Sequence, residues 1–259
     1  MAKGRLSAVS NLAIHLGNSR GSKLLTKEKS VFREYTEIVL ITVILFLFIR
    51  TEIVQAFRIP SESMEATLQV GDFLLVNKFI YGPGIPFTDV HLPGWREPDT
   101  GDILVFPYPR NPTQMFIKRC IAVAGQKVEI RDKEVYVDDV RIENPPHVKF
   151  DDPTVRPAHR SIRDNWGPKI VPTGALFVMG DNRDFSSDSR YWGFVEKNDV
   201  VGNAFIIYWS WERQSNDPEL VWQSSRPLES VASLVYVLGY NIVHVPWRVR
   251  WNRIGRIVF

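Results

Sequence analysis

Three short segments of the chain carry side chains that could perform chemistry. Residues 59–68 hold two serines separated by one residue, and residues 116–119 place Lys118 inside an apolar run. Residues 180–193 are crowded with acids, arginines and serines. Taken singly, a Ser-x-Ser pair is usually a turn or a helix cap, and a lysine in a strand usually points to solvent. Each segment alone is therefore a weak indication of a functional site.

The acidic residues of the third segment raise the question of a metal site. A calcium loop starting at Asp181 needs a glycine at its sixth position and an acid at its twelfth, where Trp192 stands. Elsewhere no group of histidines, cysteines and carboxylates has the spacing of metal ligands. We therefore expect no metal and no other cofactor.

The composition is that of a folded chain with unevenly placed charge. Of its 259 residues 44% are hydrophobic and 24% are charged, and the net charge of +3 is too small to indicate nucleic acid as the partner. Seven lysines or arginines against two glutamates precede Tyr35, and four arginines without an acid lie within residues 248–256. Basic ends on a balanced chain favour an anionic surface such as lipid headgroups. The one cysteine, Cys120, rules out an internal disulfide and is expected in the core.

The apolar run over residues 38–49 predicts a membrane anchor. Its uncharged residues cover about 18 Å as a helix, short of the roughly 30 Å hydrocarbon core, but flanking residues extend the helix to 35–54. A buried core helix and a cleaved signal peptide are the alternatives, although no small-x-small cleavage site follows. The basic segment 1–34 places the N-terminus in the cytoplasm by the positive-inside rule. The rest of the chain is then expected on the periplasmic or extracellular side of the cytoplasmic membrane.

Residues 55–213 are predicted to form a mainly β domain. Short apolar runs are separated by glycine and proline, and no long helical period lies between them, which indicates a β-barrel or sandwich. Residues 127–130 and 134–137 are expected to pair as a hairpin. The proline-rich residues 144–172 are expected to form an extended surface excursion and not a second core.

Residues 214–246 contain a second apolar stretch at 228–245. We expect an interfacial or docked helix here, because Trp247, Trp251 and several arginines follow it and tryptophan prefers the headgroup zone. A second membrane span is the alternative. Residues 247–259 then form a basic C-terminal segment.

In this order after an anchor, the segments resemble those of bacterial type I signal peptidases, the leader peptidase family of serine proteases with a Ser-Lys dyad. The resemblance covers about residues 35–210 and resumes at 250–255. Ala66 stands where the family usually has proline, a difference expected to change local rigidity, and residues 214–246 resemble an insertion. The matching motifs are Ser-Glu-Ser-Met-x-x-Thr-Leu at 61–68, Gly-Asp at 71–72, Ile-Lys-Arg at 117–119 and Gly-Asp-Asn-Arg-x-x-Ser-x-Asp-Ser-Arg-x-Trp-Gly at 180–193.

The resemblance implies a role for each matched polar residue. Ser63 matches the nucleophile and Lys118 the general base, which must be neutral, so desolvation has to lower its pKa from about 10.4 toward 8. Ser186 matches a hydroxyl that orients the lysine amine, and Ser61 matches a donor to the oxyanion hole. The charged residues expected to brace this site are Asp181, Arg183, Asp188 and Arg190. The five histidines lie outside every matching motif, which argues against a Ser-His-Asp triad: His15, His91, His147, His159 and His244.

The same resemblance implies shallow apolar substrate pockets that accept small residues, chiefly alanine, at the −1 and −3 positions of a cleavage site. The substrate is expected to bind in an extended conformation and to pair with strand edges. The residues that match the pocket positions are Phe57, Ile59, Pro60, Met64, Leu68, Phe116 and Ile117.

The sequence therefore predicts a membrane-bound serine endopeptidase that removes N-terminal signal peptides from exported preproteins after Ala-x-Ala type sites. The expected partners are preprotein signal peptides and the lipid bilayer. A soluble Ser-Lys peptidase of the self-cleaving repressor type is the second hypothesis, and the anchor argues against it. A non-enzyme, either a membrane-tethered β module or an inactive peptidase, is the third, and the filled catalytic positions argue against it.

Overall fold

The computed structural model describes residues 31–48, 53–82, 92–221 and 225–258. The predicted basic N-terminal segment up to residue 30 lies outside this part of the chain, as do His15 and His91. The chain divides into two compact units, Met1–Leu45 and Phe46–Phe259, which are described separately here.

Helix α1 (Val31–Phe48) covers the beginning of the predicted anchor. Its apolar side chains are exposed, and Arg33 pairs with Glu37 one turn later at 2.9 Å. The predicted anchor continues through residues 49–52, which lie outside the described part, to residue 54, which instead begins strand β1 (Val54–Arg58). The span over residues 35–54 remains a prediction.

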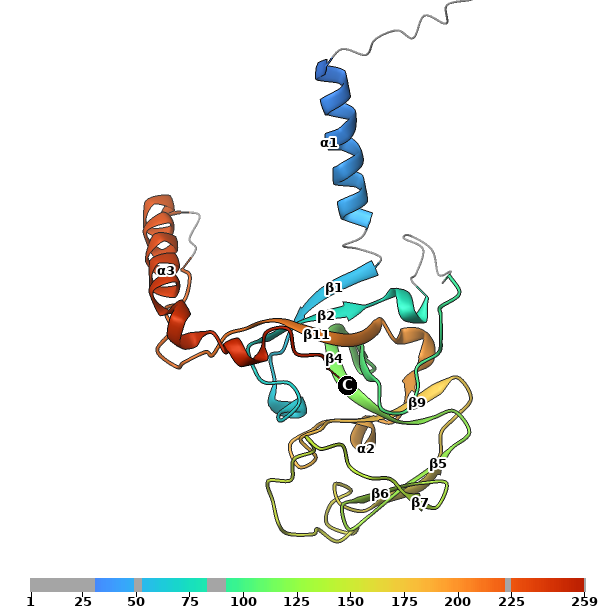
Figure 1. Ribbon diagram of the computed structural model, residues 1–259. Coiled ribbons are helices and arrows are strands. Elements are labelled where there is room, and N and C mark those ends of the chain that lie inside the picture. Colours follow the sequence, from blue (N-terminus) through green and yellow to red (C-terminus); the bar gives the residue numbers. More distant parts are fainter. Residues whose placement is uncertain (1–30, 49–52, 83–91, 222–224, 259) are drawn as a thin grey trace, which may run out of the picture. The chain divides into compact units, whose positions relative to one another are not determined.

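A seven-stranded antiparallel sheet forms the larger layer of the second unit (Figure 1). Its order is β1-β2-β11-β3-β4-β9-β10, so strands distant in the sequence lie side by side. The one-turn helix η2 (Glu62–Met64) connects β1 to β2, and α2 (Ser189–Trp192) follows β9. The remaining strands of the sheet are β2 (Asp72–Asn77), β3 (Ile103–Tyr108), β4 (Asn111–Val123), β9 (Ala175–Met179), β10 (Val195–Glu196) and β11 (Gly202–Ser210).

A four-stranded sheet of order β7-β6-β5-β8 forms the second layer. Its strands are β5 (Lys127–Arg131), β6 (Glu134–Val137), β7 (Val140–Arg141) and β8 (Trp166–Ile170). The predicted hairpin is confirmed, since Arg131 pairs with Glu134 across a two-residue turn. Asp132 and Lys133 both have positive φ, which is the backbone of the tight turns that suit hairpin twist. Buried residues of this sheet share one core with β4 and β9 of the larger sheet.

The prediction that residues 144–172 are only a surface excursion is wrong at its end. Residues 166–170 form β8, which pairs with β5, and Trp166 is buried against Phe177 with ring centroids 4.6 Å apart. Arg163 and Asp164 are also buried and form an ion pair at 2.7 Å. An isolated tryptophan among prolines gives no alternating hydrophobic pattern that would predict a strand. The segment is a strand because it pairs with β5.

Helix α3 (Pro227–Arg248) forms the predicted helix of the 214–246 insertion, followed by the one-turn helix η5 (Trp251–Arg253). Within the described residues, α3 is the helix that is long and apolar enough to cross a membrane by length and composition, and almost none of it is buried. Residues after α3 return to the large sheet, where Ile257 bridges Ile206. Another one-turn helix, η3 (Phe79–Tyr81), follows β2, and η4 (Lys197–Asp199) precedes β11.

Candidate active site

Ser63 lies in a turn that directly follows strand β1, which we call the Ser63 turn (residues 61–68). The side chains of Met64 and Leu68 are fully buried beneath it in a core shared with the sheet. Ser63 itself is 9% exposed, so most of its surface is covered by neighbouring residues. Ser61 is exposed, and its Oγ lies 3.4 Å from Ser63 Oγ, close enough for both hydroxyls to face one bound group.

The backbone at Ala66 takes a conformation that few residues with a side chain adopt, with φ of +88°. A proline ring holds φ near about −65° and could not occupy this position. The backbone at this position is therefore compatible with alanine but not with proline. The expectation that the difference affects local rigidity more than chemistry remains a prediction.

Lys118 reaches the Ser63 turn from the middle of β4, where it pairs with Leu104 of β3. Its Nζ lies 2.7 Å from Ser63 Oγ and 2.8 Å from the carbonyl oxygen of Ile117. The side chain is buried, and Nζ sits 5.2 Å from the centre of the Phe116 ring. The structure thus joins two residues that lie 55 positions apart in the sequence.

Burial lowers the pKa of Lys118 to about 8, because a charged amine loses its hydration there. The carboxylates of Asp188 and Asp181 oppose this effect by stabilising the charged form, but they do not cancel it. At pH 8 about half of the molecules then hold a neutral amine beside the Ser63 hydroxyl. A neutral amine at this distance can accept the hydroxyl proton.

Gly180, directly after β9, brings the acidic segment against the Ser63 turn. A Cβ at this position would lie 2.3 Å from both the carbonyl oxygen of Ser63 and Oγ of Ser186, so only glycine permits this approach. Asn182 N also donates to the Ser63 carbonyl oxygen at 3.1 Å. Ser186 is therefore close to the site as expected, but within the described residues no hydrogen bond joins its hydroxyl to Lys118. Its orienting role remains a prediction.

Asp181 braces the underside of the site. Its carboxylate accepts two hydrogen bonds from Arg119, each 2.8 Å long, and one from Thr67 Oγ1 at 2.5 Å. Its backbone N–H points to the sulfur of Met64. All these groups are buried, and together they tie β4, the Ser63 turn and the segment after β9 to each other.

Asp188 and Arg190 form the second buried pair of this segment, with Nη2 and Oδ2 2.8 Å apart. Burial acts to raise the pKa of Asp188, but the Arg190 guanidinium outweighs it and holds the pKa below its usual value. Asp188 also caps α2 and accepts a hydrogen bond from Gly180 N at 3.1 Å. Arg190 in turn donates to the carbonyl oxygens of Arg163 and Arg183, which connects this segment to residues before β8.

Arg183 differs from its expected bracing role. Its guanidinium is fully buried, yet none of its three nitrogens has a hydrogen-bond partner among the described residues. Burial, aided by the nearby positive charge of Arg190, lowers its pKa to about 10. The ion-pair partner of Asp181 is Arg119 of the Ile-Lys-Arg motif, a residue to which the sequence analysis gave no bracing role.

The C-terminal segment supplies a further brace that the sequence reasoning missed. Arg253 of η5 contacts the fully buried carboxylate of Asp72 and donates to the carbonyl oxygen of Thr67 at 3.0 Å. Arg250 donates to Gln69 Oε1 at 2.7 Å, and Ser210 Oγ donates to Asp72 at 2.7 Å. The Gly-Asp motif and the recurring C-terminal arginines were signals that could have indicated this contact.

The residues predicted to line substrate pockets divide by burial. Ile59, Met64 and Leu68 are almost completely buried core residues, so they shape the site from beneath. The members that keep exposed surface are Phe57 and Pro60, which precede the Ser63 turn, and Phe116 and Ile117, which precede Lys118 on β4. Phe116 stacks on Tyr108 at 4.3 Å, an aromatic neighbour absent from the predicted set.

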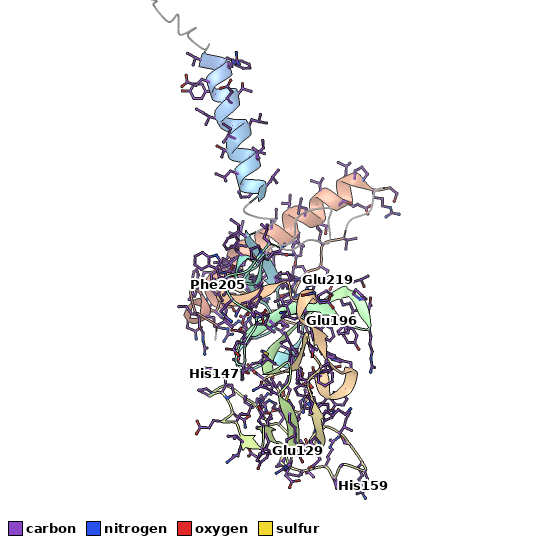
Figure 2. The ribbon with its side chains drawn as sticks, turned by 90° about the vertical axis from the view of Figure 1, so that its right-hand side faces the viewer. Glu129, His147, His159, Glu196, Phe205 and Glu219 are labelled. Carbon is purple, nitrogen blue, oxygen red and sulfur yellow. The ribbon has the colours of Figure 1, made fainter. Side chains whose placement is uncertain are left out.

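The described histidines have other contacts. His147 lies 3.0 Å from Arg256, and His244 Nδ1 lies 2.7 Å from the carbonyl oxygen of Tyr240. His159 is exposed at the end of the domain that holds the smaller sheet (Figure 2). Among the described residues, none of the histidines hydrogen-bonds to Ser63, and the titratable group beside its hydroxyl is the Lys118 amine.

A serine hydroxyl held against a buried amine, on a β scaffold, is the arrangement of a nucleophilic hydrolase. The sequence profile of the family described as "Signal peptidase, peptidase S26" matches residues 32–209. The chain therefore belongs to the signal peptidase family, whose members are serine endopeptidases.

Individual relatives agree with this assignment. The chain is 34% identical to a signal peptidase I of Aquifex aeolicus, over 80% of this chain and 93% of the relative. It is 36% identical to a signal peptidase I of Pseudomonas aeruginosa, over 66% of this chain and 71% of the relative. A crystal structure of a signal peptidase I from Enterococcus faecalis V583 aligns with 42% of this chain and 97% of that chain, at 32% identity and a TM-score of 0.31.

Proposed function

We propose that this protein cleaves N-terminal signal peptides from exported preproteins, with Ser63 as nucleophile and neutral Lys118 as general base. The observation that carries the proposal is the 2.7 Å distance between Lys118 Nζ and Ser63 Oγ in a buried site where the pKa of the lysine falls to about 8. Family membership supports the reaction class.

The reaction would begin when neutral Lys118 takes the proton of the Ser63 hydroxyl as its oxygen attacks the scissile carbonyl carbon. Negative charge then develops on the carbonyl oxygen, near the Ser63 backbone N–H and the Ser61 hydroxyl. The protonated lysine returns its proton to the departing amine, which leaves an ester on Ser63. Lys118, neutral again, removes a proton from the water that hydrolyses this ester, and the free hydroxyl is restored.

The substrate would lie in an extended conformation along the exposed edge of the sheet. Within the described residues β1 is an edge strand, and it leads directly into the Ser63 turn. Its outer backbone groups can pair with a bound peptide, while Phe57, Phe116 and Ile117 offer limited apolar surface beside the nucleophile. Such a shallow site favours small residues, as in Ala-x-Ala cleavage sites.

The membrane is the other proposed partner. An anchor over residues 35–54 would hold the catalytic unit at the outer face of the cytoplasmic membrane, with the basic N-terminal segment in the cytoplasm. Substrates whose signal peptides cross the same bilayer would then reach the site without diffusing through solution.

Cleavage of a purified preprotein with an Ala-x-Ala site, in detergent, tests the proposal. Ser63→Ala and Lys118→Ala should each lower kcat by roughly 10⁴-fold or more, while Lys169→Ala, which removes an exposed lysine of β8, should leave kcat unchanged. Cleavage at another position would contradict the proposed specificity, and an active Lys118→Ala variant would contradict the base.

A further inference from the structure

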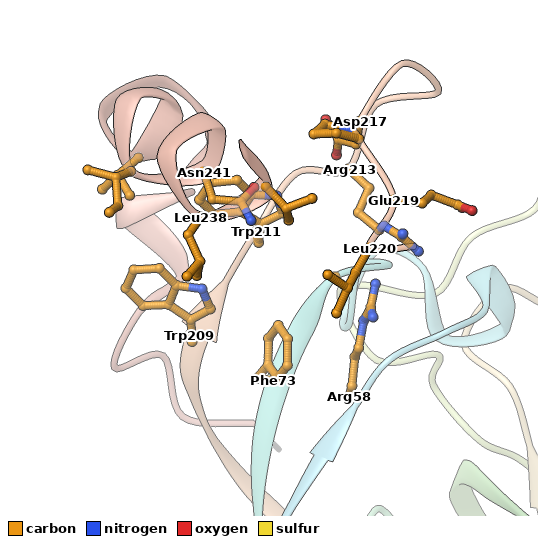
Figure 3. Close-up of a pocket in the computed structure, with 15 residues that line it drawn as sticks. Arg58, Phe73, Trp209, Trp211, Arg213, Asp217, Glu219, Leu220, Leu238 and Asn241 are labelled. Atoms are coloured by element: carbon orange, nitrogen blue, oxygen red, sulfur yellow. The ribbon is translucent and has the colours of Figure 1, made fainter. Parts of the chain in front are cut away.

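A cavity of about 670 Å³ lies between helix α3 and the face of the large sheet, well within the size range of small-molecule sites. Its apolar lining comes from aromatic residues of β2 and β11 and from aliphatic residues of α3 (Figure 3). The main contributors are Phe73, Trp209, Trp211, Leu238, Ile242 and Val245. This cavity holds none of the residues of the peptidase site.

Two guanidinium groups border the cavity without a hydrogen-bond or ion-pair partner among the described residues. Arg58 comes from the end of β1, and Arg213 comes from the segment after β11. Figure 3 shows their side chains approaching the same space from opposite sides. Within the described part of the chain neither forms a hydrogen bond or an ion pair, and the contact of Arg58 is with the Phe73 ring at 5.8 Å.

The acidic residues of the lining do not neutralise these guanidinium groups. Asp217 forms an ion pair with Arg248 at the end of α3. Glu219 is exposed, and Figure 3 shows its carboxylate directed away from Arg58 and Arg213. The cavity therefore combines an apolar interior with a positively charged border, which complements an amphiphile with an anionic headgroup.

The outer face of α3 continues this apolar surface. Its exposed aliphatic residues recur every three or four positions and so form one stripe along the helix. Two members of the stripe, Leu238 and Ile242, also line the cavity, so the cavity opens beside the stripe. The stripe consists of Leu228, Val231, Val235, Leu238 and Ile242, each more than half exposed.

The backbone beside α3 argues that the helix lies in the membrane interface and does not cross the bilayer. The segment 211–221 runs back along the helix, since Val221 N donates to Ser233 Oγ at 3.0 Å and Gln214 accepts from Arg248 at 3.0 Å. Residues 217–221 of this segment have no regular secondary structure. Their backbone polar groups would be unsatisfied in hydrocarbon, but they can be solvated at headgroup depth.

We infer that α3 and the segment 211–221 form a lipid-binding arm, whose cavity takes an acyl chain of an anionic glycerophospholipid while Arg58 and Arg213 bind its phosphate. This deepens the membrane part of the proposed function and rests on it only in requiring contact with a bilayer. Phosphate oxygens match the planar donors of arginine, and desolvation beside apolar residues strengthens such contacts.

The test uses the full chain in nanodiscs that contain a phosphatidylglycerol with a photoactivatable acyl chain. Cross-linked peptides from residues 205–245 are quantified by mass spectrometry against cross-links to α1, which serve as an internal reference. The phosphatidylglycerol probe should label the arm more strongly than a phosphatidylcholine probe with the same photoactivatable acyl chain does. In the double variant Arg58→Glu, Arg213→Glu, labelling of the arm by the phosphatidylglycerol probe should fall by roughly tenfold or more, while labelling of α1 should stay unchanged.

Two matched variants control for charge and for folding. Arg160→Glu makes the same charge reversal at one position, half the charge change of the double variant. It lies beside the exposed His159, which Figure 2 shows far from Glu219 of the cavity lining, and this variant should label normally. Arg58→Lys with Arg213→Lys keeps both charges and should retain most of the labelling. Equal labelling by the two probes, or no decrease in the glutamate variant, overturns the inference. Displacement of the probe by a signal peptide but not by unlabelled phosphatidylglycerol also overturns it, since the cavity is then a peptide site.

Peptide cleavage is measured separately on the same nanodiscs. If the unsubstituted protein labels as expected but cleaves no preprotein, the lipid site stands and the proposed function fails. If it cleaves normally and the arm is not labelled above the phosphatidylcholine probe, the peptidase stands and the lipid site fails.

Discussion

The pH dependence of cleavage follows from the environment of Lys118. Because the base must be neutral, kcat/KM should rise with pH and level off above the pKa of about 8. Below that value the neutral fraction falls tenfold for each pH unit, so activity at pH 6 should be about 1% of its maximum. A normal lysine, with its pKa of 10.5, would give a rising limb more than two pH units higher.

The assay is kcat/KM for a preprotein in detergent between pH 5.5 and 10. Lys169→Ala should give the same profile, because that lysine is exposed on the smaller sheet. A rising limb near pH 6.5 would refute the reasoning by indicating a histidine base, and one near 10.5 would show that burial does not lower the lysine pKa.

The carboxylates near the Lys118 amine allow a test of the direction in which nearby charge shifts its pKa. Asp188 and Asp181 stabilise the charged lysine, so replacing either by asparagine should move the rising limb to lower pH, whatever the loss in maximal rate. A shift to higher pH would mean that the substitution exposes Lys118 to solvent, and the electrostatic account would then be wrong.

Other substitutions test the geometry around the site. In a preprotein cleavage assay, Gly180→Ala should abolish most activity, because its methyl group would overlap the Ser63 turn. Gly239→Ala, on the open surface of α3, should retain activity in the same assay. Ala66→Gly should raise stability by about 1 kcal/mol by relieving a positive φ, measured by denaturant unfolding, and Ala66→Pro should lower it. Arg253→Met leaves a buried aspartate without its main partner and should cost about 3 kcal/mol in unfolding free energy, together with activity. Lys118 keeps its proton up to a higher pH in the unfolded chain than in the folded one. The free energy of unfolding should therefore rise by about 3 kcal/mol between pH 8 and 10.5. The substitution Lys118→Met should abolish this rise.

Local patterns account for the parts of the fold that were predicted correctly. Short apolar runs near glycine predicted β2, β3 and β9, and two such runs on either side of a polar turn predicted the hairpin between β5 and β6. Cys120 was expected in the core and is fully buried there, where burial raises the pKa of its thiol to about 12. These features depend on neighbours within a few residues, which the sequence displays directly.

The strand at 166–170 was missed because its partner strand is distant in the sequence. A segment pairs as a strand when a partner edge is available, and the partner of β8 lies about 40 residues earlier in β5. Likewise no individual strand was predicted at Val54–Arg58, which pairs residue for residue with β2.

The sequence by itself determined the chemical groups of this protein: a serine after an apolar run, one lysine within a strand, and the Gly-Asp-Asn-Arg segment, in an order that indicates the family. Only the tertiary structure decided which of these groups are desolvated and which charged groups pair with each other. The pKa of Lys118 is lowered because the folded core removes water from its amine. Asp181 pairs with Arg119 and not with Arg183 because β4 lies beside β9. The same holds for Asp72 and Arg253, which lie 181 residues apart. Desolvation and pairing depend on atoms brought together from distant positions, so no local pattern in the chain can specify them.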